Sequence, residues 1–261
     1  MSKYFNLLNA NILKLIACLF MLLDHIGYMF CPDVMILRIL GRISFPIFAY
    51  FIAEGCKYTK NRLKHFLTIF ILGVIFQIVY TISNNFDGSY LNIFITFSIS
   101  ILLIYLLQLI KHLIIDKNNI VLSILCTILL IVSIFLVYFM CNLSKFNINS
   151  KLVLDYDFYG AILPLIISLF EFRRYNTYNK ILKKLDSKYP TLILFTLGLF
   201  LLAITSRAYL HNINIEWFSF ISLIFMLFYN GMRGHYNLKY FFYVFYPIHL
   251  VILEIIYLII H

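Results

Sequence analysis

Long apolar stretches run through almost the whole chain, and they constrain its fold more than any other feature. Of the 261 residues, 63% are hydrophobic and only 12% carry a charge. A water-soluble domain of this length cannot bury so much apolar surface. About 20 consecutive apolar residues are needed for a helix to cross a lipid bilayer, and the chain divides into segments of that length. The sequence therefore predicts an all-α, polytopic integral membrane protein.

The apolar segments are separated by short polar joints, which leave no room for a soluble domain. The first segment lacks a small-residue cleavage site and is followed at once by a second, so we expect a retained helix rather than a signal peptide. The prediction is a single membrane domain over residues 1–261 with about nine transmembrane helices. The expected spans are 8–30, 34–55, 63–83, 90–115, 119–141, 158–172, 191–208, 215–229 and 240–260.

Basic residues are distributed unequally between the two sides of such a bundle. When successive joints alternate sides, most of the 21 Lys and Arg residues fall on the side of the amino terminus. The positive-inside rule then places the amino terminus in the cytoplasm and the carboxyl terminus outside. The residues counted on the inner side are Lys3, Lys14, Lys57, Lys60, Arg62, Lys64, Lys111, Lys117, Arg173, Arg174, Lys180, Lys183, Lys184, Lys188, Arg233 and Lys239.

The same bias accounts for much of the formal net charge of +10, so this charge does not indicate a nucleic-acid partner. A Gly-rich phosphate loop, an RNA-binding motif and a zinc finger are all missing from the sequence. The five cysteines are scattered, odd in number and mostly within apolar runs, which predicts small hydrophobic side chains and no metal site.

Asp24 and His25 lie inside the first apolar segment, where ionisable groups are costly and seldom without a role. Neighbouring residues on a helix point about 100° apart, so both side chains face one point only if the helix ends or distorts here. Pro32 makes a helix end near this place plausible. The ordinary pKa of histidine lies nearest neutrality, which suits His25 to removing a proton from an amine or hydroxyl. The simpler interpretation is a pair that satisfies local polar groups.

The second apolar segment carries Arg38 and Arg42 on one helix face, with Gly41 beside them and Pro46 soon after. The glycine permits close approach, and the proline opens or bends the helix. Two guanidinium groups suit a carboxylate, a phosphate or the counter-charge of Asp24, and an ion pair with Asp24 is the structural alternative. The basic run that follows is either a solvated inner loop or a binding site for cofactor phosphates.

The carboxyl-terminal segment adds a third polar group. Asn230, Gly231, Arg233 and Gly234 form a predicted turn before a run of aromatic residues. His249 falls close to the middle of the last predicted helix, where a buried histidine needs a partner. The group around Asp24 and Arg42 would supply one, and a satisfied core histidine is the alternative.

These residues resemble the TraX family. The resemblance spans nearly the whole chain and is specific in its first and last thirds; between residues 104 and 154 only the hydrophobicity is similar. The motifs that carry it are Asp-His-Ile-Gly at 24–27, Gly-Arg-Ile-Ser-Phe-Pro-Ile-Phe-Ala at 41–49, Glu-Gly at 54–55, Thr-Lys-Asn-Arg at 59–62, the blocks 92–97 and 155–160, Tyr-Asn-Gly at 229–231, Arg-Gly at 233–234 and Tyr-Pro-Ile-His-Leu at 246–250.

The resemblance implies a membrane acetyltransferase, because the family's named member acetylates the amino terminus of pilin. The first two segments are also similar to the wider superfamily of transmembrane acyltransferases, which use acyl-CoA. His25 then becomes the candidate general base, with Asp24 as its orienting partner. Arg42, with Arg38 behind it, becomes the candidate stabiliser of negative charge on the reacting acyl group. His249 is the reserve catalytic residue.

Acetyl-CoA is the acyl donor that the resemblance implies, and it implies no metal. The candidates for holding CoA on the cytoplasmic side are Lys57, Lys60, Arg62, Asn230 and Arg233. The implied location is the bacterial cytoplasmic membrane, with a peptide, protein or glycan acceptor in the envelope. Family membership does not transfer a substrate, so the acyl chain length is left open. The sequence also leaves open the oligomeric state, and whether transfer is direct or passes through an acyl-histidine intermediate.

Two alternatives belong to other functional classes. In a proton-coupled secondary transporter, Asp24, His25 and Glu54 would relay protons, although the sequence lacks the two matching halves typical of such folds. Transport into liposomes without an acyl donor would favour it. In a noncatalytic partner of a secretion or conjugation assembly, the buried charges would be structural. Retention of function in cells by His25→Ala would favour that interpretation.

Overall fold

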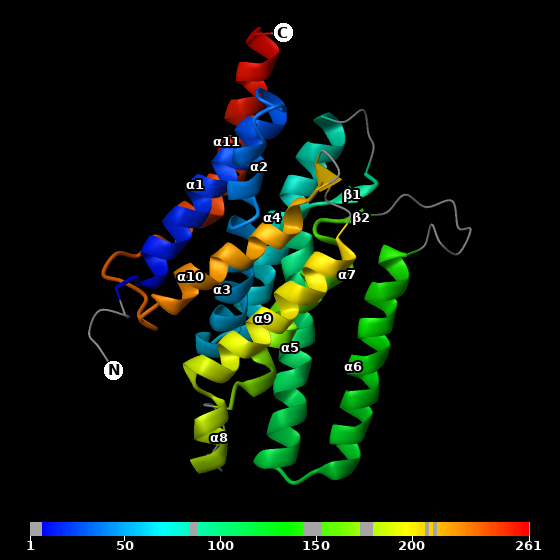
Figure 1. The fold of residues 1–261 in the computed structure, drawn as a ribbon. Coiled ribbons are helices and arrows are strands. Elements are labelled where there is room, and N and C mark those ends of the chain that lie inside the picture. The colour runs from blue at the N-terminus through cyan, green and yellow to red at the C-terminus, as the bar shows by residue number, and fades with distance from the viewer. Residues whose placement is uncertain are drawn as a thin grey trace. The chain divides into compact units, whose positions relative to one another are not determined.

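A computed structural model describes residues 7–83, 88–142, 153–172, 180–206, 209–210 and 213–260. These ranges are almost entirely helical (Figure 1), which confirms the all-α membrane class. Three of the basic residues assigned to the inner side, Lys3, Arg173 and Arg174, lie outside the described residues.

Seven helical segments in the described ranges are long and apolar enough to cross a membrane. One of them is Met35–Tyr58, which comprises α2 and α3. The others are α1 (Ala10–Met29), α4 (Arg62–Ser83), α5 (Ile93–Ile115), α6 (Ile120–Cys141), α9 (Lys188–Thr205) and α11 (Lys239–Ile260).

The prediction of nine spans is therefore wrong by two. The sixth and eighth predicted spans correspond to shorter helices, Asp157–Phe170 and Ile215–Leu227. At 10–17 residues such a helix is about 15–26 Å long, less than the bilayer core of roughly 30 Å. The first comprises α7 (Asp157–Ile167) and the 3₁₀ helix η3 (Ser168–Phe170). The second comprises the 3₁₀ helix η4 (Ile215–Ile221) and α10 (Ser222–Leu227).

The remaining elements are small. α8 spans Lys180–Leu185. β1 (Tyr90–Leu91) pairs with β2 (Val153–Leu154) in parallel, and β3 (Tyr209–Leu210) pairs with β4 (Ile213–Asn214) in antiparallel orientation. The second predicted span is interrupted between α2 (Met35–Gly41) and α3 (Ser44–Tyr58), so that Arg42 caps the carboxyl end of α2.

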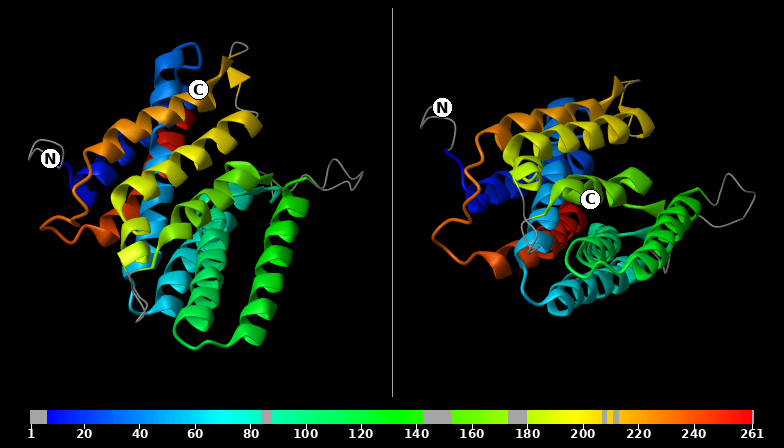
Figure 2. Two further views of the ribbon diagram at one scale, coloured as in Figure 1. Left: turned by 60° about the horizontal axis from the view of Figure 1, so that its bottom comes forward. Right: turned by 90° about the horizontal axis from the view of Figure 1, so that it is seen from below.

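Packing divides the chain into two compact units, 1–51 with 199–261 and 52–198. In the first unit, α1 lies against α2 and α11, and η4 lies against α2 (Figure 1, Figure 2). The loop before α11 covers the amino-terminal end of α1, where the N–H groups of Ala10 and Asn11 donate to the backbone oxygens of Met232 and Arg233. These bonds satisfy donors that a helix start otherwise leaves unpaired.

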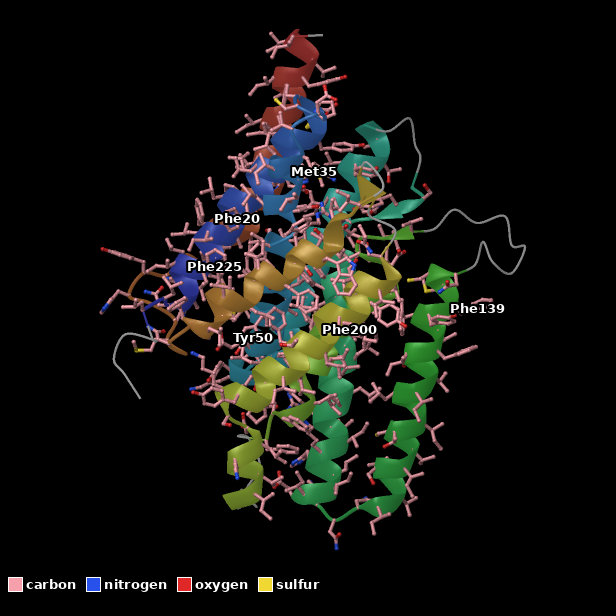
Figure 3. All side chains as sticks on the ribbon, in the orientation of Figure 1. Phe20, Met35, Tyr50, Phe139, Phe200 and Phe225 are labelled. Atoms are coloured by element: carbon pink, nitrogen blue, oxygen red, sulfur yellow. The ribbon has the colours of Figure 1, made fainter. Side chains whose placement is uncertain are left out.

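In the second unit, α5 packs against α4, α6 and α7. Asn92 caps the start of α5 and also donates from Nδ2 to the backbone oxygen of Gly73 on α4, at 2.8 Å. Figure 3 shows side chains projecting outward along α6, and Ile131 and Phe135 are each 61% exposed. An apolar face of this kind suits contact with lipid.

The second unit also buries a charged residue that the sequence analysis counted on the inner side. Lys111 lies in α5 and is 8% exposed. Its Nζ donates to the backbone oxygens of Ser168, Leu169 and Glu171 at 3.0, 2.9 and 2.9 Å. The ammonium group thus satisfies carbonyl groups at the end of η3, which predicts a structural role.

Candidate functional site

Two glycines allow α1 and α2 to approach closely in the first unit. A Cβ atom at Gly41 would lie 2.3 Å from Cβ, Cγ and Oδ1 of Asp24, and one at Gly27 would lie 2.7 Å from Cβ of Leu37. No side chain other than glycine's hydrogen fits at position 41 without a shift of Asp24. The predicted role of Gly41 in close approach therefore applies directly to the acidic residue of the Asp-His pair.

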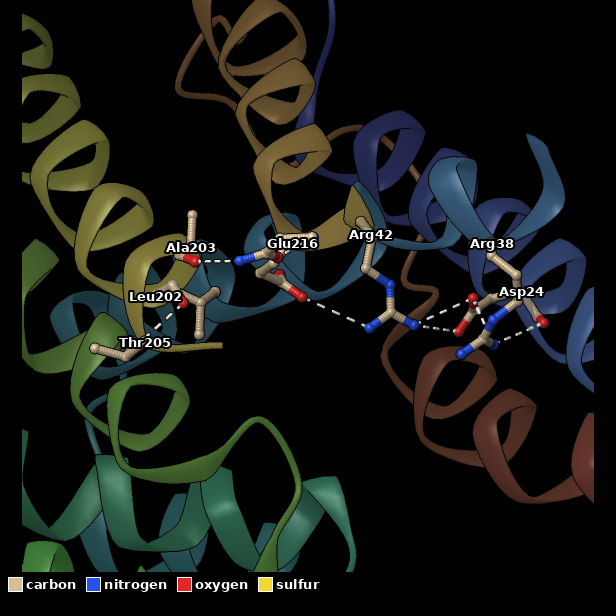
Figure 4. A network of polar contacts seen from close by, with 8 residues as sticks. Asp24, Arg38, Arg42, Leu202, Ala203, Thr205 and Glu216 are labelled. Carbon is tan, nitrogen blue, oxygen red and sulfur yellow. Dashed lines mark hydrogen bonds and ion pairs between the residues drawn. The ribbon is translucent and has the colours of Figure 1, made fainter. Parts of the chain in front are cut away.

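Asp24 lies between two arginines, Arg38 within α2 and Arg42 at the carboxyl end of α2. Arg38 Nη1 is 2.8 Å from Oδ1, and Arg42 Nη2 is 2.9 Å from Oδ2 (Figure 4). Arg38 Nη1 also donates to the backbone oxygen of Asp24 at 3.1 Å. Asp24 and Arg42 are each 8% exposed. The structure thus contains the ion pair that the sequence offered as an alternative for the arginines.

A second carboxylate completes this network, and the sequence analysis missed it. Glu216 on η4 is 1% exposed, and its Oε2 lies 3.6 Å from Nη1 of Arg42. Figure 4 shows Arg42 between Glu216 and Asp24. The sequence does carry a signal for Glu216. It is a carboxylate at the second position of the apolar segment 215–229, and such a group is as costly there as Asp24 is in the first segment. Two carboxylates and two guanidinium groups make the formal charge of the network zero.

His25 contacts the last helix rather than the ion network. Its Nδ1 lies 3.0 Å from Nε2 of His249, and the two ring centroids are 4.9 Å apart. His249 is 5% exposed, whereas His25 is only partly buried. The ring of His249 stacks on that of Phe245, with centroids 5.0 Å apart. Two histidines far apart in the sequence are therefore brought together, with His25 the more accessible.

The contacts of His249 determine which nitrogen of each neutral ring carries hydrogen. Nδ1 of His249 lies 2.8 Å from the backbone oxygen of Phe245, which can only accept a hydrogen bond, so Nδ1 donates. Nε2 of neutral His249 then accepts, and Nδ1 of His25 is its donor. This arrangement leaves Nε2 of neutral His25 with a lone pair, the state required of a base.

The structure gives Asp24 and His25 different side-chain partners. The carboxylate of Asp24 contacts Arg38 and Arg42, and the side chain bonded to His25 is that of His249. The physical reason is the helix geometry already noted, because α1 continues regularly to Met29 and adjacent residues point about 100° apart.

Three candidates for cofactor binding lie at the end of α3 and the start of α4, in the second unit. Lys57 pairs with Asp186, whose side chain is 2% exposed. The guanidinium of Arg62 lies 5.7 Å from the ring centroid of Tyr105. Lys60 is exposed. Of the three, Lys57 has a clear structural partner, and Lys60 is the most accessible to a phosphate.

The other two candidates lie in the loop that covers the start of α1, in the first unit. Oδ1 of Asn230 accepts from the backbone N–H of Met232 at 2.8 Å. Arg233 is exposed and donates from Nη2 to Oδ1 of Asn237 at 2.5 Å. Asn230 therefore shapes the loop, and Arg233 presents its charge to the surroundings. Within the described ranges, three or more His, Cys, Asp or Glu residues are nowhere grouped as metal ligands.

Comparison with known proteins gives a match to the sequence profile described as "TraX protein" over residues 9–257. The chain belongs to the TraX family. The matched residues are nearly the whole chain. Every residue of the ion network and of the histidine pair falls within the part that matches TraX.

Two curated proteins are similar to shorter parts of this TraX-family chain. "Uncharacterized protein RP591" of Rickettsia prowazekii (strain Madrid E) is 40% identical over 72 residues, which are 28% of the chain and 27% of that protein. "Probable fimbrial assembly protein FimC, serogroup H1" of Dichelobacter nodosus is 34% identical over 79 residues, 29% of the chain and 32% of that protein. The chain thus spans about a third or less of these relatives. No solved structure matches it.

Proposed function

We propose that this TraX-family protein is a multi-pass acetyltransferase of the bacterial cytoplasmic membrane, which transfers the acetyl group of acetyl-CoA to an envelope acceptor. The observation that carries the proposal is the hydrogen-bonded pair of His25 and His249, in which Nε2 of the accessible His25 has a lone pair. A base so oriented is suited to activating a nucleophile.

In the proposed step, Nε2 of His25 removes the proton from an acceptor N–H or O–H as that atom forms a bond to the thioester carbonyl carbon. The tetrahedral intermediate then loses CoA as the carbon–sulfur bond breaks, and the proton on His25 passes to the thiolate. The products are the acetylated acceptor and CoA. His249 does not contact the acceptor in this proposal; it holds the ring of His25 in the required orientation.

The proposal ranks Arg38 above Arg42 as the stabiliser of negative charge on the carbonyl oxygen. Arg42 uses both terminal nitrogens on carboxylates, whereas the described hydrogen bonds and ion pair of Arg38 all use Nη1. The side chain of Arg38 is also more exposed, at 20% against 10%. A guanidinium group has five N–H donors, so Arg38 retains donors for an acyl oxygen.

The test is acetyl-CoA turnover by protein purified in detergent, with mass spectrometry of envelope peptides and glycans to identify the acceptor. His25→Ala should lower turnover by about 10²–10⁴-fold and retain CoA binding by isothermal titration. His235→Ala is the matched control, because His235 is an exposed histidine outside the pair. If neither the wild type nor the variants bind CoA, the proposal fails.

A noncatalytic role in a fimbrial or conjugation assembly is the second candidate, favoured by the name of the Dichelobacter relative. In that role the ion network and histidine pair would only hold helices together. Cells carrying His25→Ala at normal protein levels would then assemble pili or transfer DNA as the wild type does. If the variant protein is present at normal levels and that function is lost, a purely noncatalytic role is disfavoured.

A further inference from the structure

The buried face of η4, continued by the first residue of α10, carries three polar residues in line. A 3₁₀ helix has three residues per turn, so Glu216, Ser219 and Ser222 project from one side. They are 1%, 0% and 0% exposed. We call these three residues the polar face of η4. At seven residues, η4 is longer than the 3–4 residues usual for a 3₁₀ helix.

Two hydroxyl groups on this face have no hydrogen-bond partner among the described residues. They are the Oγ atoms of Ser219 and Ser222, both inaccessible. Other buried serines differ, because the hydroxyl of Ser44 donates to the backbone oxygen of Ala17 at 2.8 Å and that of Ser100 to Ala161 at 2.7 Å. Burial of an unpaired hydroxyl group costs free energy. Two such groups on one helix face indicate that they bond to a polar molecule outside the protein chain.

The polar face extends from the ion network toward the amino-terminal end of α1. Glu216 contacts Arg42, which is bonded to Asp24. Farther along the chain, the ring of Phe225 packs on that of Phe20, and Tyr229 pairs with Leu8. Figure 1 shows η4 and α10 (orange) continuing to the loop beside the start of α1. Three basic residues, Lys14, Arg233 and Lys239, lie in or beside this end of the bundle, and such a cluster favours the cytoplasmic side.

The ligand indicated is an extended, polar and largely uncharged chain that enters from the cytoplasmic side. A serine hydroxyl both donates and accepts, so it suits amide and hydroxyl groups. Successive positions on the polar face are about 6 Å apart along the 3₁₀ axis. Along α1, about 20 Å separate Asp24 from the amino-terminal end of the helix. Arg233 lies in the loop that covers this end.

We infer that the polar face of η4 binds the pantetheine arm of the acyl donor, an inference that rests on the proposed function. Ser219 and Ser222 bond to the amide groups of the arm, and the thioester end lies toward Arg42 and Asp24. The phosphates remain at the exposed loop, where Arg233 meets them. The donor is favoured over the acceptor because the polar face leads toward the cytoplasmic end of α1.

The chain contains one tryptophan, and it reports on this helix directly. Trp217 follows Glu216 and stacks on Phe220, with ring centroids 5.8 Å apart. The first measurement is Trp217 fluorescence during titration with CoA and with pantetheine. We expect a saturable change with both probes. Ser219→Ala with Ser222→Ala should weaken CoA binding about tenfold, since each lost hydrogen bond changes affinity severalfold.

Ser44→Ala is the matched control, since it also removes a buried hydroxyl from the first unit, but one with a protein partner. We expect the Tm of the double variant to stay at or above that of the wild type, and the Tm of the control to fall with CoA affinity retained. The KM for acetyl-CoA should rise in the double variant, and the KM for the acceptor should not.

Unchanged CoA affinity of the double variant would overturn the inference if the wild type turns over acetyl-CoA. A rise in acceptor KM alone would also overturn it, because the acceptor would then occupy the polar face. A third outcome separates the two proposals. If CoA binds saturably and binds more weakly to the double variant, the site is supported. If no wild-type preparation turns over acetyl-CoA as well, the proposed transferase activity is contradicted.

Discussion

Nε2 of His249 lies 3.0 Å from Nδ1 of His25, although 224 positions separate the two residues in the chain. The contact joins the first and last long helices, which also pack along one another. Because Nδ1 of His249 donates to the backbone oxygen of Phe245, the pair has one consistent neutral arrangement. That arrangement assigns base chemistry to His25 and a positioning role to His249.

Loss of His249 should alter the tautomer of His25 as well as the rate. We expect His25→Ala to lower kcat/KM by about 10²–10⁴-fold, the usual contribution of a general base. His249→Ala should cost about 10–100-fold, as is typical when the partner that orients a histidine is removed. Nitrogen-15 NMR of labelled imidazoles should show His25 protonated at Nδ1 in the wild type and redistributed toward Nε2 in His249→Ala. An unchanged tautomer together with an unchanged rate would contradict the positioning role.

Removal of the charge on Asp24 should destabilise the protein more than removal of a single arginine contact. Asp24→Ala leaves Arg38 and Arg42 without the carboxylate that both contact, and breaking a buried ion pair costs about 3–5 kcal/mol. Arg38→Ala should cost less, because Arg42 still pairs with Asp24 and Arg38 is more exposed. Thermal unfolding in detergent checks the order. An Asp24→Ala Tm equal to that of the wild type would refute it.

The class of fold was predictable because it follows from apolar length and composition alone. Long runs of apolar residues admit few alternatives to transmembrane helices. The number of spans was not, because an apolar segment near Ser219 has the same composition whether it crosses a bilayer or forms a short helix. The observed end of helical hydrogen bonding, and not hydropathy, distinguishes those two cases.

The residue types of the site were predictable, since Asp24, His25, Arg42 and His249 each stand out as costly in an apolar segment. Their partners depend on how helices pack. Adjacency in sequence suggested that Asp24 orients His25, whereas helix geometry turns the two side chains to different neighbours. Glu216 carried the same sequence signal as Asp24, and its pairing with Arg42 depends on the packing of η4 against α2.

Gly41→Ala should destabilise the contact of α1 with α2. The added Cβ would lie 2.3 Å from atoms of the Asp24 side chain, so the helices or the carboxylate must move. Overpacking of this kind costs about 1–3 kcal/mol. Gly88→Ala is the control, because a Cβ there meets Thr81 Oγ1 at an ordinary 3.6 Å. A Gly41→Ala protein with wild-type Tm and turnover would contradict the close approach.

Lys111→Met should lower stability without a specific effect on chemistry. The variant leaves the backbone oxygens at the end of η3 without the ammonium group that bonds to three of them. We expect a loss of about 3 kcal/mol, since hydrogen bonds to a charged group are worth about 1.5–3 kcal/mol each and part of the loss is recovered by relaxation. Lys117→Met, at an exposed position, should change Tm little. Chemical denaturation of both variants in detergent measures the difference.

Lys57 and Lys60 should separate a structural charge from a binding charge. Lys57→Ala leaves the buried carboxylate of Asp186 without its ion pair, so Tm should fall while CoA affinity stays the same. Lys60→Ala should leave Tm unchanged and weaken CoA binding about two- to fivefold, as expected for an exposed charge pair. Added salt should reduce the Lys60 effect, because exposed charges are screened. The reverse pattern, with CoA affinity lost only in Lys57→Ala, would assign the phosphate contact to Lys57 and leave Lys60 a solvated inner-loop residue.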